Sequence, residues 1–158
     1  MTQRAVVIRP ARADEFPTLS TLWLAASRGA HGFLGAARLE AQRPLIEQTY
    51  LPGSRTHVAE ADGVLLGFIG LIGDFVGGLF VAPEAQGQGI GRRLLDHAKA
   101  RHGRLELEVY TGNPGALRFY LSQGFREISR RPQDSEGLPF ETARLAWAPP
   151  LTAARTAG

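Results

Sequence analysis

Apolar side chains recur along this chain with two periods, one typical of strands and one typical of helices. Residues 105–110 read Leu-Glu-Leu-Glu-Val-Tyr, a strict alternation that predicts a strand with one buried face. Residues 88–102 instead space their apolar side chains for one side of a helix. Both periods occur along the chain, separated by glycine and proline, and they predict an α+β fold.

Turn and capping residues divide this pattern into elements. Strands are expected at residues 5–9, 56–61, 64–72, 75–81, 105–110, 125–131 and 141–147. Helices are expected after an N-cap at Asp14 and at residues 36–50, 88–102 and 115–123. The order is therefore β-α-α-β-β-β-α-β-α-β-β, in one domain over residues 1–149 with a loose tail at 150–158.

Composition narrows the possible chemistry. The 158 residues include no cysteine, which excludes disulfides, thiolate nucleophiles and cysteine-ligated metals. The histidines lack metal-ligand spacing, so no metal is expected. The chain has no long apolar run, and aromatic residues do not interleave with its basic residues. We therefore expect a cytoplasmic protein that binds neither membrane nor nucleic acid, and the net charge of +3 suits a phosphate-bearing ligand.

A glycine-rich loop joins the expected strand at 75–81 to the helix that follows. It reads Gln86-Gly87-Gln88-Gly89-Ile90-Gly91-Arg92. Glycines let a backbone approach a ligand closely, and the first N–H groups of a helix can donate to phosphate oxygens. The spacing differs from the dinucleotide fingerprint, and a P-loop lysine is absent. The loop therefore predicts a diphosphate site of another class.

A second block identifies that class. Asn113-Pro114-Gly115-Ala116-Leu117-Arg118-Phe119-Tyr120 and then Gln123-Gly124-Phe125 follow the strand at 105–110. The two blocks, in this order, resemble the signatures of the GNAT superfamily, the Gcn5-related N-acetyltransferases. The resemblance implies an acetyl-CoA-dependent N-acetyltransferase with a mixed seven-stranded sheet and helices on both faces. It also implies that the fourth and fifth strands run parallel and splay apart to admit pantetheine.

The resemblance assigns the cofactor-binding residues. The pyrophosphate is expected to be bound by backbone N–H groups of the glycine loop, namely Gln86, Gly87, Gln88, Gly89, Ile90, Gly91 and Arg92. Phe80 and Val81 supply main-chain groups to pantetheine, and Asn113 binds the cofactor arm, caps the helix after it, or does both. Gly77 and Gly78 predict a bulge in the fourth strand. Of Arg92 and Arg93, at least one is expected to approach phosphate.

The resemblance also assigns the catalytic residues, with the base left open. Tyr120 matches the tyrosine that protonates the CoA thiolate, and its alternative role is core packing. The general base is either Glu108, twelve residues before Tyr120, or His31, or a water relay. The segment His31-Gly32-Phe33-Leu34 also resembles a segment of small bacterial acetyltransferases of unassigned substrate.

The expected reaction is direct attack of a primary amine on acetyl-CoA in a ternary complex, because no cysteine can carry an acyl group. The amine could belong to a small molecule, a peptide or a protein. The segment 134–140 either selects this amine or is an ordinary hairpin connection. An alternative is a catalytically weak acyl-CoA-binding regulatory module, since the general base is unspecified. The resemblance makes a homodimer through the C-terminal strands plausible.

Overall fold

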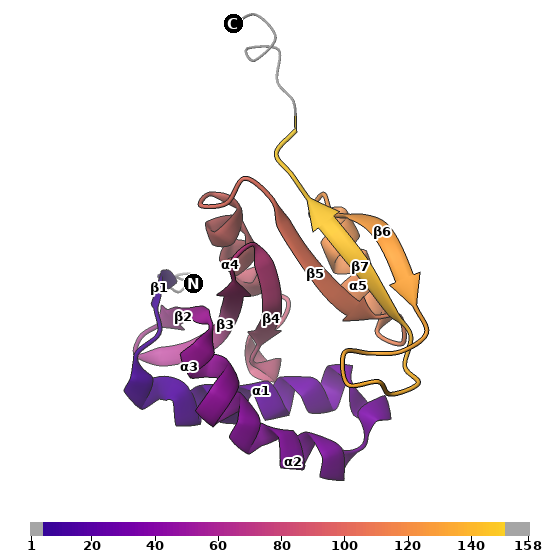
Figure 1. Cartoon of the computed structure of the whole chain (residues 1–158). Coiled ribbons are helices and arrows are strands. Elements are labelled where there is room, and N and C mark those ends of the chain that lie inside the picture. The colour runs from indigo at the N-terminus through magenta and orange to yellow at the C-terminus, as the bar shows by residue number, and fades with distance from the viewer. Residues whose placement is uncertain (1–4, 151–158) are drawn as a thin grey trace, which may run out of the picture.

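A computed structural model describes residues 5–150, and a seven-stranded sheet runs through its centre (Figure 1). The strands are β1 (Val7–Pro10), β2 (Arg55–Ala61), β3 (Val64–Ile72), β4 (Phe75–Val81), β5 (Leu105–Tyr110), β6 (Arg126–Arg131) and β7 (Thr142–Trp147). Their order across the sheet is β1-β2-β3-β4-β5-β7-β6. Only the β4–β5 pair among these described strands is parallel. The predicted mixed sheet is thus confirmed.

Helices cover both faces of this sheet. They are α1 (Phe16–Ala30), α2 (Ala36–Leu45), α3 (Leu51–Gly53), α4 (Ile90–Lys99) and α5 (Pro114–Ser122). Two glycines of β3 mark the two faces, because residues three apart in a strand point in opposite directions. A Cβ on Gly67 would meet Ile90 and Leu94 of α4, whereas a Cβ on Gly70 would meet the Tyr50 ring. The prediction of helices on both faces is confirmed.

Strands β4 and β5 meet at one end and then diverge (Figure 1). Their only paired register position is Phe75 with Glu106, near the start of each strand. Beyond it, the β4 backbone groups that face β5 lack a strand partner there. The β3–β4 register shifts between Gly70–Gly78 and Leu71–Val76, which leaves Gly77 as the extra residue of a bulge. The predicted splay and bulge are both present.

Two boundary predictions were wrong, and one predicted helix changes its hydrogen-bonding pattern partway along. Asp14 does not cap α1, because it lies inside a 3-10 turn (Ala13–Glu15) whose capping box pairs Arg12 with Glu15. Residues 36–50 are helical as expected, but α2 ends at Leu45 and the helix continues as a π turn (Ile46–Tyr50) and then α3. Pro44 lies just before this change, and a proline within a helix removes one backbone donor. Helix α4 covers residues 90–99, not 88–102.

The remaining predicted elements lie where the pattern placed them, within a residue or two. The apolar positions of α4 and β5 are buried, namely Ile90, Leu94, Leu95, Ala98, Leu105, Leu107 and Val109. The tail predicted at residues 150–158 falls, from residue 151 onward, outside the described residues, and the domain boundary stays a prediction.

An ion network fastens the N-terminal edge of the fold. The Arg9 guanidinium on β1 donates to Glu15 at 2.6 and 3.0 Å and to Glu60 of β2 at 2.8 Å. Glu15 is buried, and the Arg9 guanidinium lowers its pKa to about 2. The network therefore joins the first strand, the second strand and the start of α1, away from the β4–β5 divergence.

Candidate active site

A cavity of about 880 Å³ occupies the divergence between β4 and β5. The strands contribute residues 76–81 and 107–110 to its wall. Its other lining groups come from the glycine loop, the start of α5, the N-terminal helices and the β6–β7 connection. One space therefore connects the glycine loop with side chains from distant parts of the sequence.

The glycine loop forms the start of α4 and leaves that helix end free. Gly87 and Gly89 adopt φ values of +80° and +79°, a conformation that L side chains rarely adopt. Gly89 is the N-cap residue, and no described side chain caps the helix there. The first intrahelical bond runs from the Arg93 N–H to the Gly89 carbonyl at 3.1 Å. The N–H groups of Ile90, Gly91 and Arg92 thus precede it and can donate to an anion.

The polar side chains around this loop divide into two groups. Arg92 lines the cavity, with a side chain that is 70% exposed and only a loose contact of 3.7 Å to Asp96. Arg93 instead donates to the Val6 carbonyl at 3.0 Å. Of the two arginines considered from the sequence, Arg92 is therefore the one available to a phosphate. The side-chain amides of Gln86 and Gln88 lie 3.4 Å from backbone carbonyls and brace the loop.

Phe80 and Val81 lie on β4 at the cavity wall. The Phe80 ring packs edge-on against Trp23 of α1, with centroids 6.4 Å apart, and against Phe68 in the core. Packing fixes this side chain, and the β4 backbone remains open on the side of β5. A ligand with amide groups can extend the sheet there.

Tyr120 lies on α5, is buried, and reaches the cavity wall. Burial raises the pKa of its phenol above the usual 10, and nearby Tyr50 contributes in the same direction. The phenol therefore stays protonated at neutral pH, as a proton donor must. Tyr50 belongs to the π turn, and its hydroxyl presses against Gly77, where a Cβ would collide with it. That hydroxyl has no hydrogen-bond partner in residues 5–150.

Asn113 and His31 meet at the cavity wall. Asn113 Oδ1 accepts the Ala116 N–H at 3.2 Å, so Asn113 caps α5. That bond turns Nδ2, which can only donate, toward His31 Nε2 at 3.3 Å. His31 Nε2 is then the acceptor, which selects the tautomer with the proton on Nδ1. Burial lowers the pKa of His31, so its neutral form prevails at pH 7.

Glu108 also lines the cavity, but it has an ionic partner. Its carboxylate accepts from Arg131 of β6 at 3.1 Å, and its side chain is 20% exposed. Glu106, two residues earlier on the same strand face, pairs with Arg104 and with Arg144 at 2.8 Å. The structure thus places both base candidates at the cavity, with the imidazole neutral and the carboxylate held by arginine.

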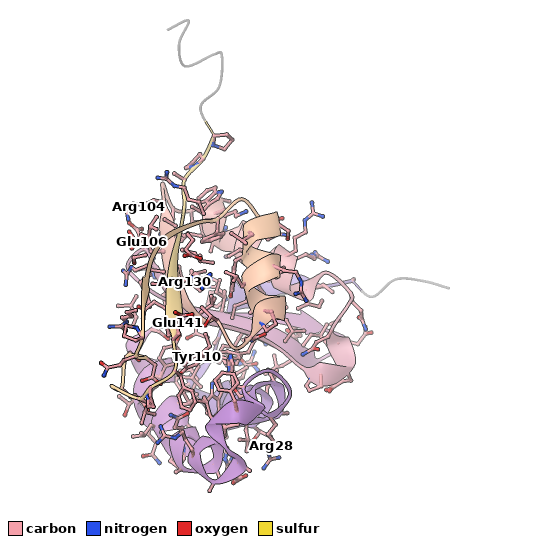
Figure 2. The ribbon with its side chains drawn as sticks, turned by 90° about the vertical axis from the view of Figure 1, so that its right-hand side faces the viewer. Arg28, Arg104, Glu106, Tyr110, Arg130 and Glu141 are labelled. Carbon is pink, nitrogen blue, oxygen red and sulfur yellow. The ribbon has the colours of Figure 1, made fainter. Side chains whose placement is uncertain are left out.

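Two lining residues, Tyr110 and Asp134, were not identified from the sequence as functional side chains. Tyr110 ends β5, and its hydroxyl donates to Asp134 in the β6–β7 connection at 3.0 Å. Figure 2 shows Tyr110 where the strands approach the N-terminal helices. Alternation from Glu108 would have put Tyr110 on the cavity side, but its partner lies 24 residues away. Asp134, Ser135 and Glu136 reach the cavity, so the segment 134–140 does border the site.

Two searches of the described residues were negative. No cluster of three or more histidine, aspartate or glutamate side chains in residues 5–150 could hold a metal ion. Within that same range, none of the helices combines the length and the apolar character that crossing a membrane requires.

Comparison with known proteins gives consistent sequence matches. A model of the acetyltransferase (GNAT) domain matches residues 52–127. The peptidyl-lysine N-acetyltransferase YiaC of Escherichia coli K12 is 39% identical over 142 residues, which cover 89% of this chain and 96% of YiaC. The peptidyl-lysine N-acetyltransferase YjaB of the same strain is 31% identical over 144 residues, or 90% and 97% of the two chains.

Solved structures share the architecture. The solution structure of apo-form YjaB from Escherichia coli matches with a TM-score of 0.82 and 30% identity, covering 90% of this chain and 97% of YjaB. The PaiA N-acetyltransferase of Thermoplasma acidophilum, solved in complex with coenzyme A, matches with a TM-score of 0.75 over 92% and 99% of the two chains. At 19% identity this second match bears on the fold alone.

Proposed function

The chain belongs to the GNAT family of acetyltransferases, and we propose that the amine it acetylates is the side chain of a lysine in a peptide or protein. The observation that supports acetyl transfer at this site is that one cavity joins a free helix N-terminus to a buried phenol and a neutral imidazole. The names of YiaC and YjaB, both peptidyl-lysine N-acetyltransferases, support the choice of acceptor.

Acetyl-CoA binds along β4 in this proposal. The N–H groups of residues 90–92, together with Gly87 and Gly89, hold the pyrophosphate, and Arg92 adds a positive charge. The pantetheine amides pair with the open β4 backbone at Phe80 and Val81, and Asn113 contacts the arm from the other side. This arrangement aims the thioester at the bulge around Gly77 and at Tyr120.

His31 is the general base in this proposal. An acceptor amine arrives as ammonium and must lose a proton before its nitrogen can attack the thioester carbonyl. Burial keeps the imidazole neutral, and its Nε2 lone pair, which accepts from Asn113 Nδ2, becomes able to take that proton, directly or through water, when the Asn113 amide turns from His31 to the cofactor arm. Glu108 is the second candidate, and its pairing with Arg131 makes it the weaker one.

Tyr120 is the general acid. Attack of the amine gives a tetrahedral intermediate, which collapses as the carbon–sulfur bond breaks. The Tyr120 phenol donates its proton to the leaving sulfur, so that CoA departs as a thiol, and the extra proton on the attacking nitrogen passes to the phenolate and restores Tyr120. Burial raises the pKa of the phenol, so the proton is present at neutral pH until the sulfur develops charge. The absence of cysteine from the chain supports direct attack over an acyl-enzyme route.

Acetylation of blocked peptides tests the acceptor. The purified chain is incubated with acetyl-CoA and with peptides that are acetylated at the N-terminus, amidated at the C-terminus and contain one lysine. Mass spectrometry is expected to find one added acetyl group on the lysine, and free CoA is expected to form at the same rate. Peptides with a free α-amine and no lysine, and small polyamines, are the matched alternatives. Turnover confined to these alternatives would reject the proposed acceptor.

Three finer predictions accompany the proposal. We expect a cytoplasmic protein that does not bind nucleic acid. A homodimer through the C-terminal strands stays a prediction, and the exposed edge strand β6 is the surface it would use. Light scattering of the purified chain would measure its mass directly.

A further inference from the structure

The acceptor side of the cavity contains one polar pair whose hydrogen-bond direction is fixed. Tyr110 and Asp134 both line the cavity, and the Tyr110 hydroxyl donates to Asp134 Oδ2 at 3.0 Å. Burial raises the pKa of Tyr110 above its usual range, and the Asp134 carboxylate adds to this effect. The phenol therefore keeps its proton, and that proton is committed to Asp134.

The surrounding loop holds the Asp134 carboxylate in place. Asp134 is buried, and its Oδ1 accepts the backbone N–H groups of Glu136 and Leu138, each at 2.9 Å. The backbone reinforces the turn, since Asp134 N–H donates to Leu138 and Gly137, at φ +79°, donates to Asp134. The three donors to this carboxylate are all neutral. These hydrogen bonds therefore fix the orientation of the carboxylate, and none of them neutralises its negative charge.

The consequence is a cavity group that can accept hydrogen bonds and cannot donate one. With its proton directed at Asp134, the Tyr110 oxygen presents only lone pairs to other partners. Hydrogen bonding to a carboxylate also polarises that oxygen and makes it a better acceptor. A protonated primary amine has three donors and no acceptor, so it is the complementary ligand.

Aromatic rings complete the subsite. The Tyr110 ring packs edge-on against His31 and Phe33, with centroids 5.3 Å away in each case, and 6.4 Å from Phe140. Tyr110 and His31 line the cavity and offer ring surfaces to the methylene stem of a lysine and to its cation, while Phe33 and Phe140 pack against Tyr110 and hold its ring in place. The ring of His31 thereby also lies beside the group that would hold the ammonium.

We propose that the Tyr110 hydroxyl, oriented by Asp134, receives the ammonium of the acceptor lysine and presents it to His31. Tyr110 is then an acceptor-binding residue, and Asp134 is a positioning residue that acts through it. This inference rests on the proposed lysine acetyltransferase function. It adds that the acceptor is recognised as a cation before it loses its proton.

Steady-state kinetics with a blocked single-lysine peptide test the pair. Tyr110→Phe keeps the ring and removes the oxygen, and it is expected to raise KM for the peptide at least about tenfold, because a charge-assisted hydrogen bond is lost. Asp134→Asn is expected to act in the same direction. Its amide can donate to Tyr110, which would turn the phenol proton toward the cavity and against the ammonium. For both variants, the dissociation constant for CoA is expected to change by less than about twofold.

A second ligand separates recognition of the ammonium from packing. The same peptide with norleucine in place of lysine keeps the stem and lacks the charge, and it is measured as a competitive inhibitor. Tyr110→Phe is expected to leave its inhibition constant unchanged. The matched control variant is Glu141→Gln, another acid-to-amide change between β6 and β7. Glu141 lies outside the cavity lining, and its carboxylate accepts from Thr111 at 2.8 Å and pairs with Arg130 at 3.3 Å (Figure 2 labels Glu141 and Arg130). It is expected to leave KM unchanged.

The outcomes distinguish this inference from the proposed function. Absence of lysine acetylation by the wild-type chain would reject the proposed function itself. Lysine acetylation by wild type, with an unchanged KM in both Tyr110→Phe and Asp134→Asn, would overturn the role of the pair. Equal weakening of the lysine and norleucine peptides would also overturn it, since the effect would then come from packing. Unaltered CoA binding shows that each variant is folded.

Discussion

In the proposed arrangement, the two ends of the cavity recognise their ligands with different parts of the chain. The cofactor end uses backbone, through the N–H groups at the start of α4 and the open edge of β4. The acceptor end uses side chains from three separate segments, with His31, Tyr110 and Asp134 in contact across them. Backbone recognition requires glycine at particular positions and so leaves a local motif. Side-chain recognition depends on residues that only the fold brings together, so it leaves almost no local motif in the sequence.

The proposed catalytic acid, Tyr120, lies between the two ends, and its loss is expected to have the largest effect. Tyr120→Phe keeps the buried ring and removes the proton donor. We expect kcat to fall about 10³-fold, within the usual range for general acid catalysis. The dissociation constant for CoA, measured by calorimetry, should stay near the wild-type value. A kcat within a factor of about three of wild type would exclude Tyr120 as the acid.

The proposed base at the acceptor end is expected to come next. His31→Gln should lower kcat by about 10²-fold. In the wild-type chain kcat/KM should fall as the pH drops through a pKa below the usual 6.5, because burial lowers this pKa and protonated His31 cannot act as a base. The variant should lack that limb of the pH profile. Assays from pH 5 to 8 would measure both effects.

Two further variants sharpen the assignment of the base. His102→Gln changes a histidine outside the cavity lining, which pairs with Asp74 at 2.9 Å, and it should leave the profile unchanged. Asn113→Asp still caps α5, but its carboxylate can accept from His31 Nε2. It should therefore raise the pKa of His31 and move the limb to higher pH. A limb that persists in His31→Gln would favour Glu108 or a water relay.

The cofactor end should respond to a change that the fold itself tolerates. Gly91 has no positive φ, and a Cβ there would make only ordinary contacts of 3.6 Å with Phe119 and Val81. Gly91→Ala is expected to raise thermal stability slightly, by up to about 1 kcal/mol, because alanine favours helix. It should weaken CoA binding by about tenfold, since the methyl group restricts access to the helix N-terminus.

The matched control for this change is Gly103→Ala. That glycine also lacks a positive φ, has open space around its Cβ position and lies outside the cavity lining. It should leave CoA affinity unchanged. If Gly91→Ala binds CoA as well as Gly103→Ala does, the glycine does not serve close approach of the cofactor.

The smallest effect on activity is expected from the ion network that contacts neither end. Glu15→Gln removes a carboxylate whose pKa in the folded protein is about 2. Because folding lowers this pKa, the carboxylate stabilises the protein above its unfolded pKa, near 4.5, and that contribution disappears as the pH falls toward 2. We expect a loss of about 2 kcal/mol at pH 7. Denaturation at pH 7 and pH 3 should show the difference shrinking, with KM and CoA affinity unchanged.

Local patterns predicted much of the fold, including the glycine loop that begins α4 at the proposed cofactor end. The alternation in β5 and the apolar side of α4 each specify an element from adjacent residues, and the structure has both. The bulge at Gly77 was also predictable, since glycine in a strand is typical of bulges. These features depend on backbone conformation, which neighbouring residues determine.

The errors and omissions share a different cause. Asp14 has the chemistry of an N-cap, yet Glu15 reaches Arg9 on β1 and shifts the start of the helix. The π turn at 46–50 puts Tyr50 against Gly77, which lies in another layer of the fold. Tyr110 and Asp134 acquire their roles only when β5 and the β6–β7 connection come together. Contacts between segments that are distant in the sequence determine these features. A single sequence does not show which residues of those segments will meet.

Residue-resolved NMR during a titration with coenzyme A tests most directly whether the two ends are separate. Glycine amides report on both, with Gly87, Gly89 and Gly91 at the cofactor end and Gly137 in the turn that holds Asp134. We predict large, saturable shifts for the first three and little change for Gly137. Shifts centred on Gly137, with the loop glycines unmoved, would contradict the account.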